Sequence, residues 1–121
     1  MKIKRGDILY ADMGVQFHGS IQGGIRPVVV VSNNKANKYS MVFTVVPLTS
    51  NIHKKKRLPT HVFINAYRAE GLEKHSIALC EQVTALGYDR IIECFGSVDE
   101  DAMKWITLAV QVQVGVFDKY N

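Results

Sequence analysis

Short apolar runs, separated by polar loops, make up most of the chain. Residues 27–32 and 41–48 are apolar almost throughout and rich in β-branched side chains, which is typical of strands buried on both faces. Residues 7–13 alternate loosely between polar and apolar, as a half-buried strand does. The pattern predicts strands at 7–13, 27–32, 41–48, 60–64, 77–83 and 91–98. Between them we expect a Gly-rich loop at 14–24, a turn at 33–40 and a basic loop at 49–58.

The last part of the chain has a helical period instead of a strand period. Apolar residues recur three or four positions apart at Met103, Ile106, Val110, Val114 and Phe117. Ser97 and Glu100 have the spacing of a capping box, and acidic residues suit the first turn that follows. We therefore predict a helix over 99–118. Its apolar side is wide, since it includes Trp105 and Leu108, and a second partner such as another subunit is one explanation of that width.

Together these elements predict a mainly β fold with one C-terminal helix packed on a small, strongly bent antiparallel sheet or barrel. The 121 residues fit a single domain, 1–121, and the 47% of hydrophobic residues excludes a disordered chain. No apolar run approaches the roughly 20 residues of a membrane-spanning helix, and none follows the basic N-terminus as in a signal peptide. Two cysteines, Cys80 and Cys94, are too few for a disulfide framework, so we expect a reduced, cytoplasmic protein.

Charge is distributed unevenly along the chain. The net charge is +4, but residues 1–57 contain 10 Lys and Arg against 2 Asp and Glu, and residues 58–121 contain 5 against 9. This asymmetry indicates a polyanionic partner for the first half of the chain. The alternative is that the basic run 54–57 is only a solvated loop tip.

Arg26 and Thr49 are the residues that best suit chemistry on a phosphate. Arg26 stands between the flexible pair Gly23–Gly24 and a β-branched run, where its planar guanidinium would sit at the mouth of a strand. Thr49 ends the next buried strand, and its hydroxyl suits a phosphate oxygen. The alternatives are an arginine that caps the strand through a salt bridge and a threonine that only forms a turn.

Other candidates point to nucleic acid, and each has a structural alternative. Phe17 and Tyr39 are placed in loops, where they could stack on bases or fold back into the core. Glu81 and Gln82, near the end of a strand, could read base edges or keep an edge strand from pairing. The four histidines form no metal-binding motif, and no phosphate-binding glycine fingerprint or nucleophile motif occurs, so we expect no metal and no cofactor.

Taken together, five stretches in register resemble the MazF/PemK/Kid family of toxins from bacterial toxin–antitoxin pairs, and most closely its MazF branch of the Gram-positive type. The stretches are 5–8 (Arg-Gly-Asp-Ile), 22–32 (from Gln-Gly-Gly-Ile-Arg-Pro), 47–50 (Pro-Leu-Thr-Ser), 58–62 (Leu-Pro-Thr-His-Val) and 76–83 (Ser-Ile-Ala-Leu-Cys-Glu-Gln-Val). The resemblance implies an SH3-like β-barrel with a C-terminal helix, and a homodimer. It also implies a metal-independent, sequence-specific endoribonuclease that cuts single-stranded mRNA and leaves 2′,3′-cyclic phosphate and 5′-hydroxyl ends.

The resemblance assigns roles to individual residues and to a partner. Arg26 and Thr49 fall on the family's catalytic arginine and threonine. The RNA groove is implied to run along Phe17, His18, Ser20, Gln22, Ser50, Leu58, Pro59, Thr60, Glu81 and Gln82. The partner is a MazE-like antitoxin with an acidic, partly disordered C-terminal tail that blocks the groove, and with which the toxin binds DNA.

One position departs from the family pattern. Many relatives have a glutamate just before the Gln of the first loop, and this chain has Ile21 there. Either Arg26 and Thr49 suffice with water, or His18 substitutes as a base, or the activity is reduced. Two other functions remain alternatives: a CcdB-like toxin on the same barrel that binds DNA gyrase, and an RNA-binding module without strong catalysis.

Overall fold

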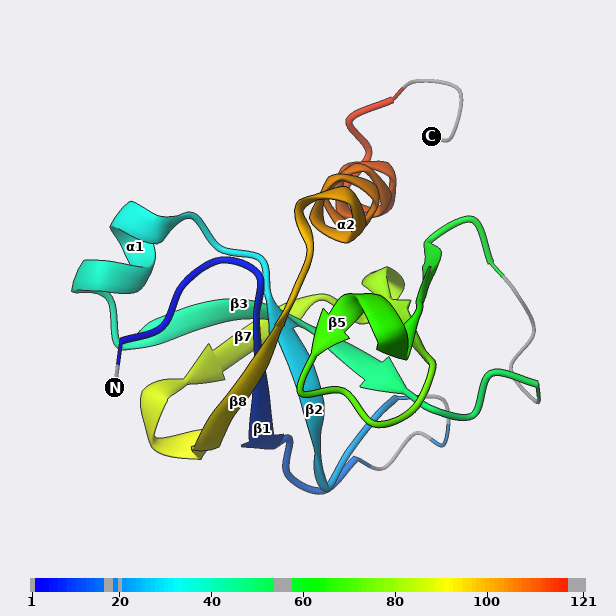
Figure 1. Ribbon diagram of the computed structural model, residues 1–121. Helices are drawn as coiled ribbons and strands as arrows, with labels where there is room; N and C mark the ends of the chain where they lie inside the picture. The colour runs from blue at the N-terminus through cyan, green and yellow to red at the C-terminus, as the bar shows by residue number, and fades with distance from the viewer. Residues whose placement is uncertain (1, 17–18, 20, 54–57, 118–121) are drawn as a thin grey trace.

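Antiparallel strands form one strongly curled sheet, seen in Figure 1 as a nearly closed barrel. The computed structural model describes residues 2–16, 19, 21–53 and 58–117. Within them the strands are β1 (Asp7–Asp12), β2 (Ile25–Val30), β3 (Val42–Thr49), β4 (His61–Ile64), β5 (Ala69–Glu70), β6 (Ser76–Leu79), β7 (Thr84–Gly87) and β8 (Ile91–Val98). The sheet order is β4-β6-β3-β2-β1-β8-β5, and β7 also pairs with β3.

Short helical segments connect strands, and a longer C-terminal helix follows the last strand. The α-helices are α1 (Asn34–Tyr39) and α2 (Glu100–Gln113), and the 3-10 turns are η1 (Ala66–Arg68), η2 (Cys80–Gln82) and η3 (Tyr88–Arg90). Figure 1 shows α2 lying across the top of the barrel and α1 at one side. In the described part of the chain, no helix is long and apolar enough to span a membrane.

The central strands bury both of their faces, as their unbroken apolar runs predict. Successive residues of a strand point to opposite faces. Val29 and Val46 therefore join a core that includes Ile106 of α2, whereas Val28 and Val45 join a second core on the other face of the sheet. All five side chains are fully buried.

Pro47 marks the place where β3 changes its partner. The pairing of β3 with β7 ends at Val45 opposite Thr84, and the pairing with β6 begins at Leu48 opposite Ala78. A proline has no N–H to donate, so it fits at a position between two hydrogen-bonded ladders. The change of partner directs the end of β3, with Thr49, towards β6 and β4.

Two glycines allow β5 to cross β8 at close range. A Cβ on Gly96 would lie 1.9 Å from the carbonyl oxygen of Glu70, and one on Gly71 would lie 2.2 Å from that of Phe95. Gly71 also has a φ of +81°, which favours glycine. Residues with side chains would force these strands apart.

The mainly β fold with a C-terminal helix is confirmed, and the differences from the sequence prediction are local. The predicted capping box is wrong: Asp99 caps α2 by accepting the N–H of Ala102 at 2.8 Å, while Ser97 still belongs to β8. The helix ends at Gln113 instead of 118, and Gly115 follows with a positive φ.

Four other segments were predicted with the wrong conformation or missed. The turn expected at 33–40 contains α1, because the side chain of Asn33 caps it by accepting the N–H of Ala36. The strand expected at 77–83 stops at Leu79 and continues as η2. The short strands β5 and β7 were not predicted, since neither has a long apolar run.

Candidate nucleic-acid interface

Arg26 is held in place by backbone carbonyls and by no carboxylate. It is the second residue of β2, where the glycine-rich loop joins the strand. Its Nε donates to the carbonyl of Gly23 at 3.0 Å, and its Nη1 donates to that of Leu48 at 3.4 Å. Among the described residues it has no ion-pair partner, so a salt-bridged strand cap is not what the structure shows. Burial lowers the pKa of the guanidinium from its ordinary value. A cation fixed in this way has N–H groups left for an external anion.

Thr49, the last residue of β3, lies at the same end of the sheet as Arg26, because Nη1 of Arg26 donates to the carbonyl of the preceding residue, Leu48. The pairing of β2 with β3 ends at Val28 and Pro47, and the same register extended by two residues would set Arg26 opposite Thr49. Opposed residues of antiparallel strands project to the same face. The Thr49 hydroxyl oxygen accepts the N–H of Asn51 at 3.2 Å, so the threonine does form a turn. Its hydroxyl hydrogen remains for a second acceptor, such as a phosphate oxygen.

A network of three side chains, the Glu81 cluster (Thr60, His61 and Glu81), lies on the other side of the interface. Glu81 accepts a hydrogen bond from Oγ1 of Thr60 at 3.0 Å, and its second oxygen lies 2.9 Å from Nε2 of His61. Nδ1 of His61 accepts the N–H of Leu58 at 3.2 Å, which places the hydrogen of the neutral ring on Nε2. The segment from Leu58 to Thr60 is thereby fixed against η2, and the N–H of Cys80 donates to the carbonyl of Thr60 at 3.1 Å.

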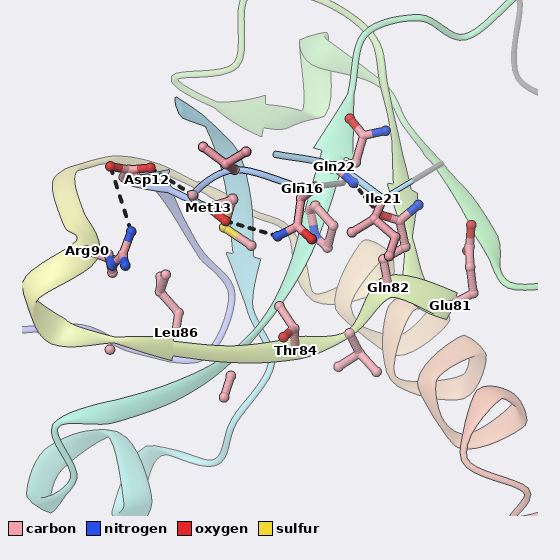
Figure 2. Close-up of a pocket in the computed structure, with 16 residues that line it drawn as sticks. Asp12, Met13, Gln16, Ile21, Gln22, Glu81, Gln82, Thr84, Leu86 and Arg90 are labelled. Carbon is pink, nitrogen blue, oxygen red and sulfur yellow. Dashed lines mark hydrogen bonds and ion pairs between the residues drawn. The ribbon is translucent and has the colours of Figure 1, made fainter. Parts of the chain in front are cut away.

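A cavity of about 700 Å³ opens between the first loop, η2 and β7 (Figure 2). Gln22 lies over Gln82 there, and its N–H donates to Oε1 of Gln82 at 2.8 Å. Ile21, at the position where relatives were expected to have a carboxylate, also lines this cavity and is 47% exposed. The first loop is therefore attached to η2, the turn that contains Glu81, and the sequence of the loop, 14–24, contains no acidic residue.

Four of the predicted RNA-groove residues that the structure describes meet around η2: Gln22, Glu81 and Gln82 line the cavity, and Thr60 bonds to Glu81. Leu58 and Pro59 are exposed, Pro59 lines a separate hollow beside α2, and Ser50 is exposed next to Thr49. Phe17, His18, Ser20 and the basic run 54–57 lie outside the described residues.

Tyr39 is not brought to this interface. It belongs to α1, which follows the far end of β2 from Arg26, and its ring contacts the Nζ of Lys38 at 5.4 Å (Figure 1). His61 was missed as a site residue although it stands within the stretch 58–62 that carried the resemblance. Its spacing of one residue from Thr60 gives no sign of the shared contact with Glu81, which depends on the fold.

The two cysteines carry thiols whose pKa is raised, which disfavours the reactive thiolate. Cys80 is fully buried under η2, and burial together with the charge of Glu81 raises the pKa of its thiol to about 12. Burial and the neighbouring Asp7 also raise the pKa of the half-buried Cys94. No three His, Cys, Asp or Glu side chains of the described residues lie close enough together to hold a metal ion.

Comparison with known proteins places this geometry in a family. The family model described as "PemK-like, MazF-like toxin of type II toxin-antitoxin system" matches residues 4–114. Endoribonuclease EndoA of Bacillus subtilis (strain 168) is 37% identical over 118 residues, covering 98% of this chain and 99% of that protein.

Solved structures share the fold over almost the whole chain. MazF from Deinococcus radiodurans superposes with a TM-score of 0.79 at 21% identity, covering 95% of this chain and 98% of that one. An endoribonuclease in complex with its cognate antitoxin, from Mycobacterial species, has a TM-score of 0.75 at 23% identity and covers 95% and 97%. Since the family model spans nearly all of the residues and the Bacillus relative aligns end to end, the chain belongs to the PemK-like, MazF-like family of toxins of type II toxin–antitoxin systems.

Proposed function

We propose that this toxin is a metal-independent, sequence-specific endoribonuclease that cuts single-stranded mRNA. The observation that carries the proposal is the Arg26 guanidinium, which among the described residues is held by backbone carbonyls alone, at the same end of the sheet as Thr49. A charged fork without an acidic partner suits a phosphodiester. The name of the Bacillus relative, an endoribonuclease, supports the same reaction.

The reaction is an attack of the RNA on itself. The 2′-oxygen forms a bond to the adjacent phosphorus and loses its proton to water, while the bond from phosphorus to the 5′-oxygen breaks and that oxygen gains a proton. The products are a 2′,3′-cyclic phosphate and a 5′-hydroxyl. Arg26 binds the phosphoryl oxygens and stabilises the charge that builds up on them, and Thr49 donates its hydroxyl hydrogen to the same group. Arg26 is always charged, so its role is electrostatic, and we assign no side chain as general base.

Recognition of the RNA would take place on both sides of this pair. Gln22 and Gln82 approach each other in the cavity, and their amide groups can donate to and accept from base edges. The carboxylate of Glu81 is already engaged by Thr60 and His61, so we infer that it shapes the groove. Bases must be unstacked and unpaired to reach these groups, which favours single strands. The predicted RNA contacts of Phe17, His18, Ser20, Ser50, Leu58 and Pro59 remain part of the proposal.

We propose two protein partners, a second copy of the chain and an antitoxin. Trp105 and Phe63 are about half exposed and line neighbouring hollows between α2 and β4, a surface that suits a homodimer. A similar toxin from Mycobacterial species is found in complex with its cognate antitoxin. Because the first half of the chain is strongly basic, an acidic antitoxin tail would compete with RNA for the same surface. We place the toxin in the cytoplasm, where mRNA is available.

The experiment is a cleavage assay with purified protein and single-stranded RNA in excess EDTA, followed by sequencing of the new 5′ ends. We expect cuts at one recurring sequence, and 5′ ends that can be ligated only after treatment with a polynucleotide kinase. Loss of cutting on addition of EDTA would refute the mechanism. Intact RNA, together with trapped gyrase–DNA complexes, would replace the proposal with the gyrase-binding alternative.

A further inference from the structure

A second concave surface, of about 420 Å³, lies beside Ser50 between the end of β3 and the η1 turn. Tyr67 and His75 line it, and the ring of Phe63, which lines the hollows beside α2, packs against His75. The proposed reaction uses none of these three rings, which we call the aromatic shelf. Tyr67 is 91% exposed, so its ring contributes little to the core. Its backbone is nevertheless fixed, because its N–H donates to Oδ1 of Asn65 at 2.8 Å.

His75 holds the shelf together. Its ring centroid lies 5.5 Å from that of Phe63 and 5.6 Å from that of Tyr67, and it meets the Tyr67 ring edge to face. Its Nδ1 accepts the N–H of Ala66 at 3.0 Å, so Nε2 carries the hydrogen of the neutral ring and remains a donor when the ring is protonated. The shelf thus combines an exposed aromatic face with a fixed N–H donor.

The strand register relates the shelf to the reaction site. Thr49 lies opposite Ile77, and Ile77 lies opposite Phe63. Opposed residues share one face of the sheet. Thr49 and Phe63 are therefore two strand spacings apart on the same face, about 10 Å. Ser50, which follows Thr49, lines the hollow that contains Tyr67 and His75. An RNA strand with its phosphate at Thr49 can reach the shelf within a few nucleotides.

We propose that the aromatic shelf binds a base of the RNA that flanks the scissile phosphate; this rests on the proposed endoribonuclease function. The base stacks on the ring of Tyr67, and Nε2 of His75 donates to the nucleotide. Lys74 and Glu73 both line the hollow, so the charges there are of mixed sign and stacking supplies most of the binding. A second copy of the chain suits this hollow less well, since the polar residues Ser50, Glu73 and Lys74 line it, whereas the half-exposed Trp105 lines a separate hollow together with Phe63.

The test compares Tyr67→Ala and His75→Ala with the wild type on two RNAs that contain the same cleavage sequence. One RNA ends close to the scissile bond on each side, and the other extends several nucleotides in both directions. We expect Tyr67→Ala to cut the short RNA at the wild-type rate and the extended RNA about 5- to 100-fold less efficiently, mainly through KM. Tyr67→Phe should behave as the wild type, and so should the control Tyr39→Ala, which removes an exposed ring on α1.

The possible outcomes distinguish failure of the aromatic-shelf proposal from failure of the proposed endoribonuclease function. A wild-type protein that cuts no RNA refutes the function. A Tyr67→Ala variant that cuts both RNAs normally, or loses the same factor on both, refutes the shelf alone. Sedimentation of each variant provides the last comparison: if Tyr67→Ala turns a dimer into a monomer, the ring belongs to a subunit interface and the proposal is overturned.

Discussion

Two sides of the interface satisfy their polar groups in opposite ways. In the Glu81 cluster, Thr60, His61 and Glu81 bond to one another, and the carboxylate has both oxygens occupied. Arg26 and Thr49, in contrast, bond only to the backbone, and Arg26 has no acidic partner among the described residues. The difference is the basis for our proposal that the uncompensated cation binds the phosphate of the RNA, whereas the completed network shapes the groove.

Replacement of Arg26 tests this contrast most strongly. We expect Arg26→Ala to lower kcat/KM for RNA by about 10²- to 10³-fold, because an oriented donor is lost where charge develops. Stability should change little, since the guanidinium bonds only to two carbonyls. The kcat/KM of Arg26→Lys, which keeps the positive charge without the planar guanidinium, should lie between those of the wild type and of Arg26→Ala. Single-turnover cleavage and urea unfolding measure both effects, and a fully active Arg26→Ala would contradict the assignment.

The next largest effect is expected at Thr49. Thr49→Val keeps the branched shape but removes the hydroxyl, so we expect a loss of about 10- to 100-fold in kcat from one hydrogen bond to a charged group. Thr49→Ser retains the hydroxyl and should retain most of the rate. A loss of rate in Thr49→Ser together with full activity in Thr49→Val would mean that packing of the threonine methyl at this buried position matters, and not the hydroxyl.

The sequence predicted the positions of Arg26 and Thr49 in the fold better than those of the Glu81 cluster, for a physical reason. Arg26 and Thr49 stand at the ends of long apolar strands, so a hydrophobic pattern is enough to place them next to each other in space. His61 and Glu81 are 20 residues apart and meet only because β4 pairs with β6 and η2 follows β6. The strand predicted over 77–83 would have alternated Glu81 and Gln82 across two faces. The turn of η2 instead directs Glu81 to His61 and Gln82 to Gln22.

The short elements escaped prediction for a related reason. β5 has two residues, and it can pair with β8 only because Gly71 and Gly96 allow a close approach. A glycine in a sequence does not reveal which carbonyl will come near it. The cap of α2 was misplaced because two residues, Ser97 and Asp99, could serve, and pairing of Ser97 with Asp7 in the sheet leaves the role to Asp99.

A variant of the Glu81 cluster should change stability and selectivity more than rate. Glu81→Gln keeps the acceptor for Thr60 but turns an amide N–H₂ towards the Nε2 hydrogen of His61. We expect a loss of about 1–3 kcal/mol in the free energy of unfolding. Cleavage sites should become less uniform, while kcat on the preferred RNA falls by less than in Arg26→Ala. Urea unfolding and sequencing of 5′ ends provide the measurements, and unchanged stability with a large loss of kcat would make Glu81 catalytic instead.

The smallest expected effect concerns Cys80, the buried residue just before Glu81. In the folded protein the pKa of its thiol is raised to about 12, first by burial and then by the charge of Glu81, from an ordinary value of 9.0. The thiol therefore stays protonated in the folded state while the unfolded chain ionises above pH 9. Its contribution to stability is complete below pH 9 and is lost as the pH rises from there towards 12, by at most about 1.4 kcal/mol per pH unit. Urea unfolding of the wild type and of Cys80→Ala at pH 7 and pH 10 isolates this contribution, because lysines and tyrosines titrate in both proteins. The free energy of unfolding of the wild type should fall more than that of the variant between pH 7 and pH 10. Equal decreases in the two proteins would mean that water reaches the thiol of Cys80, and hence that η2 is less firmly packed than its contacts indicate.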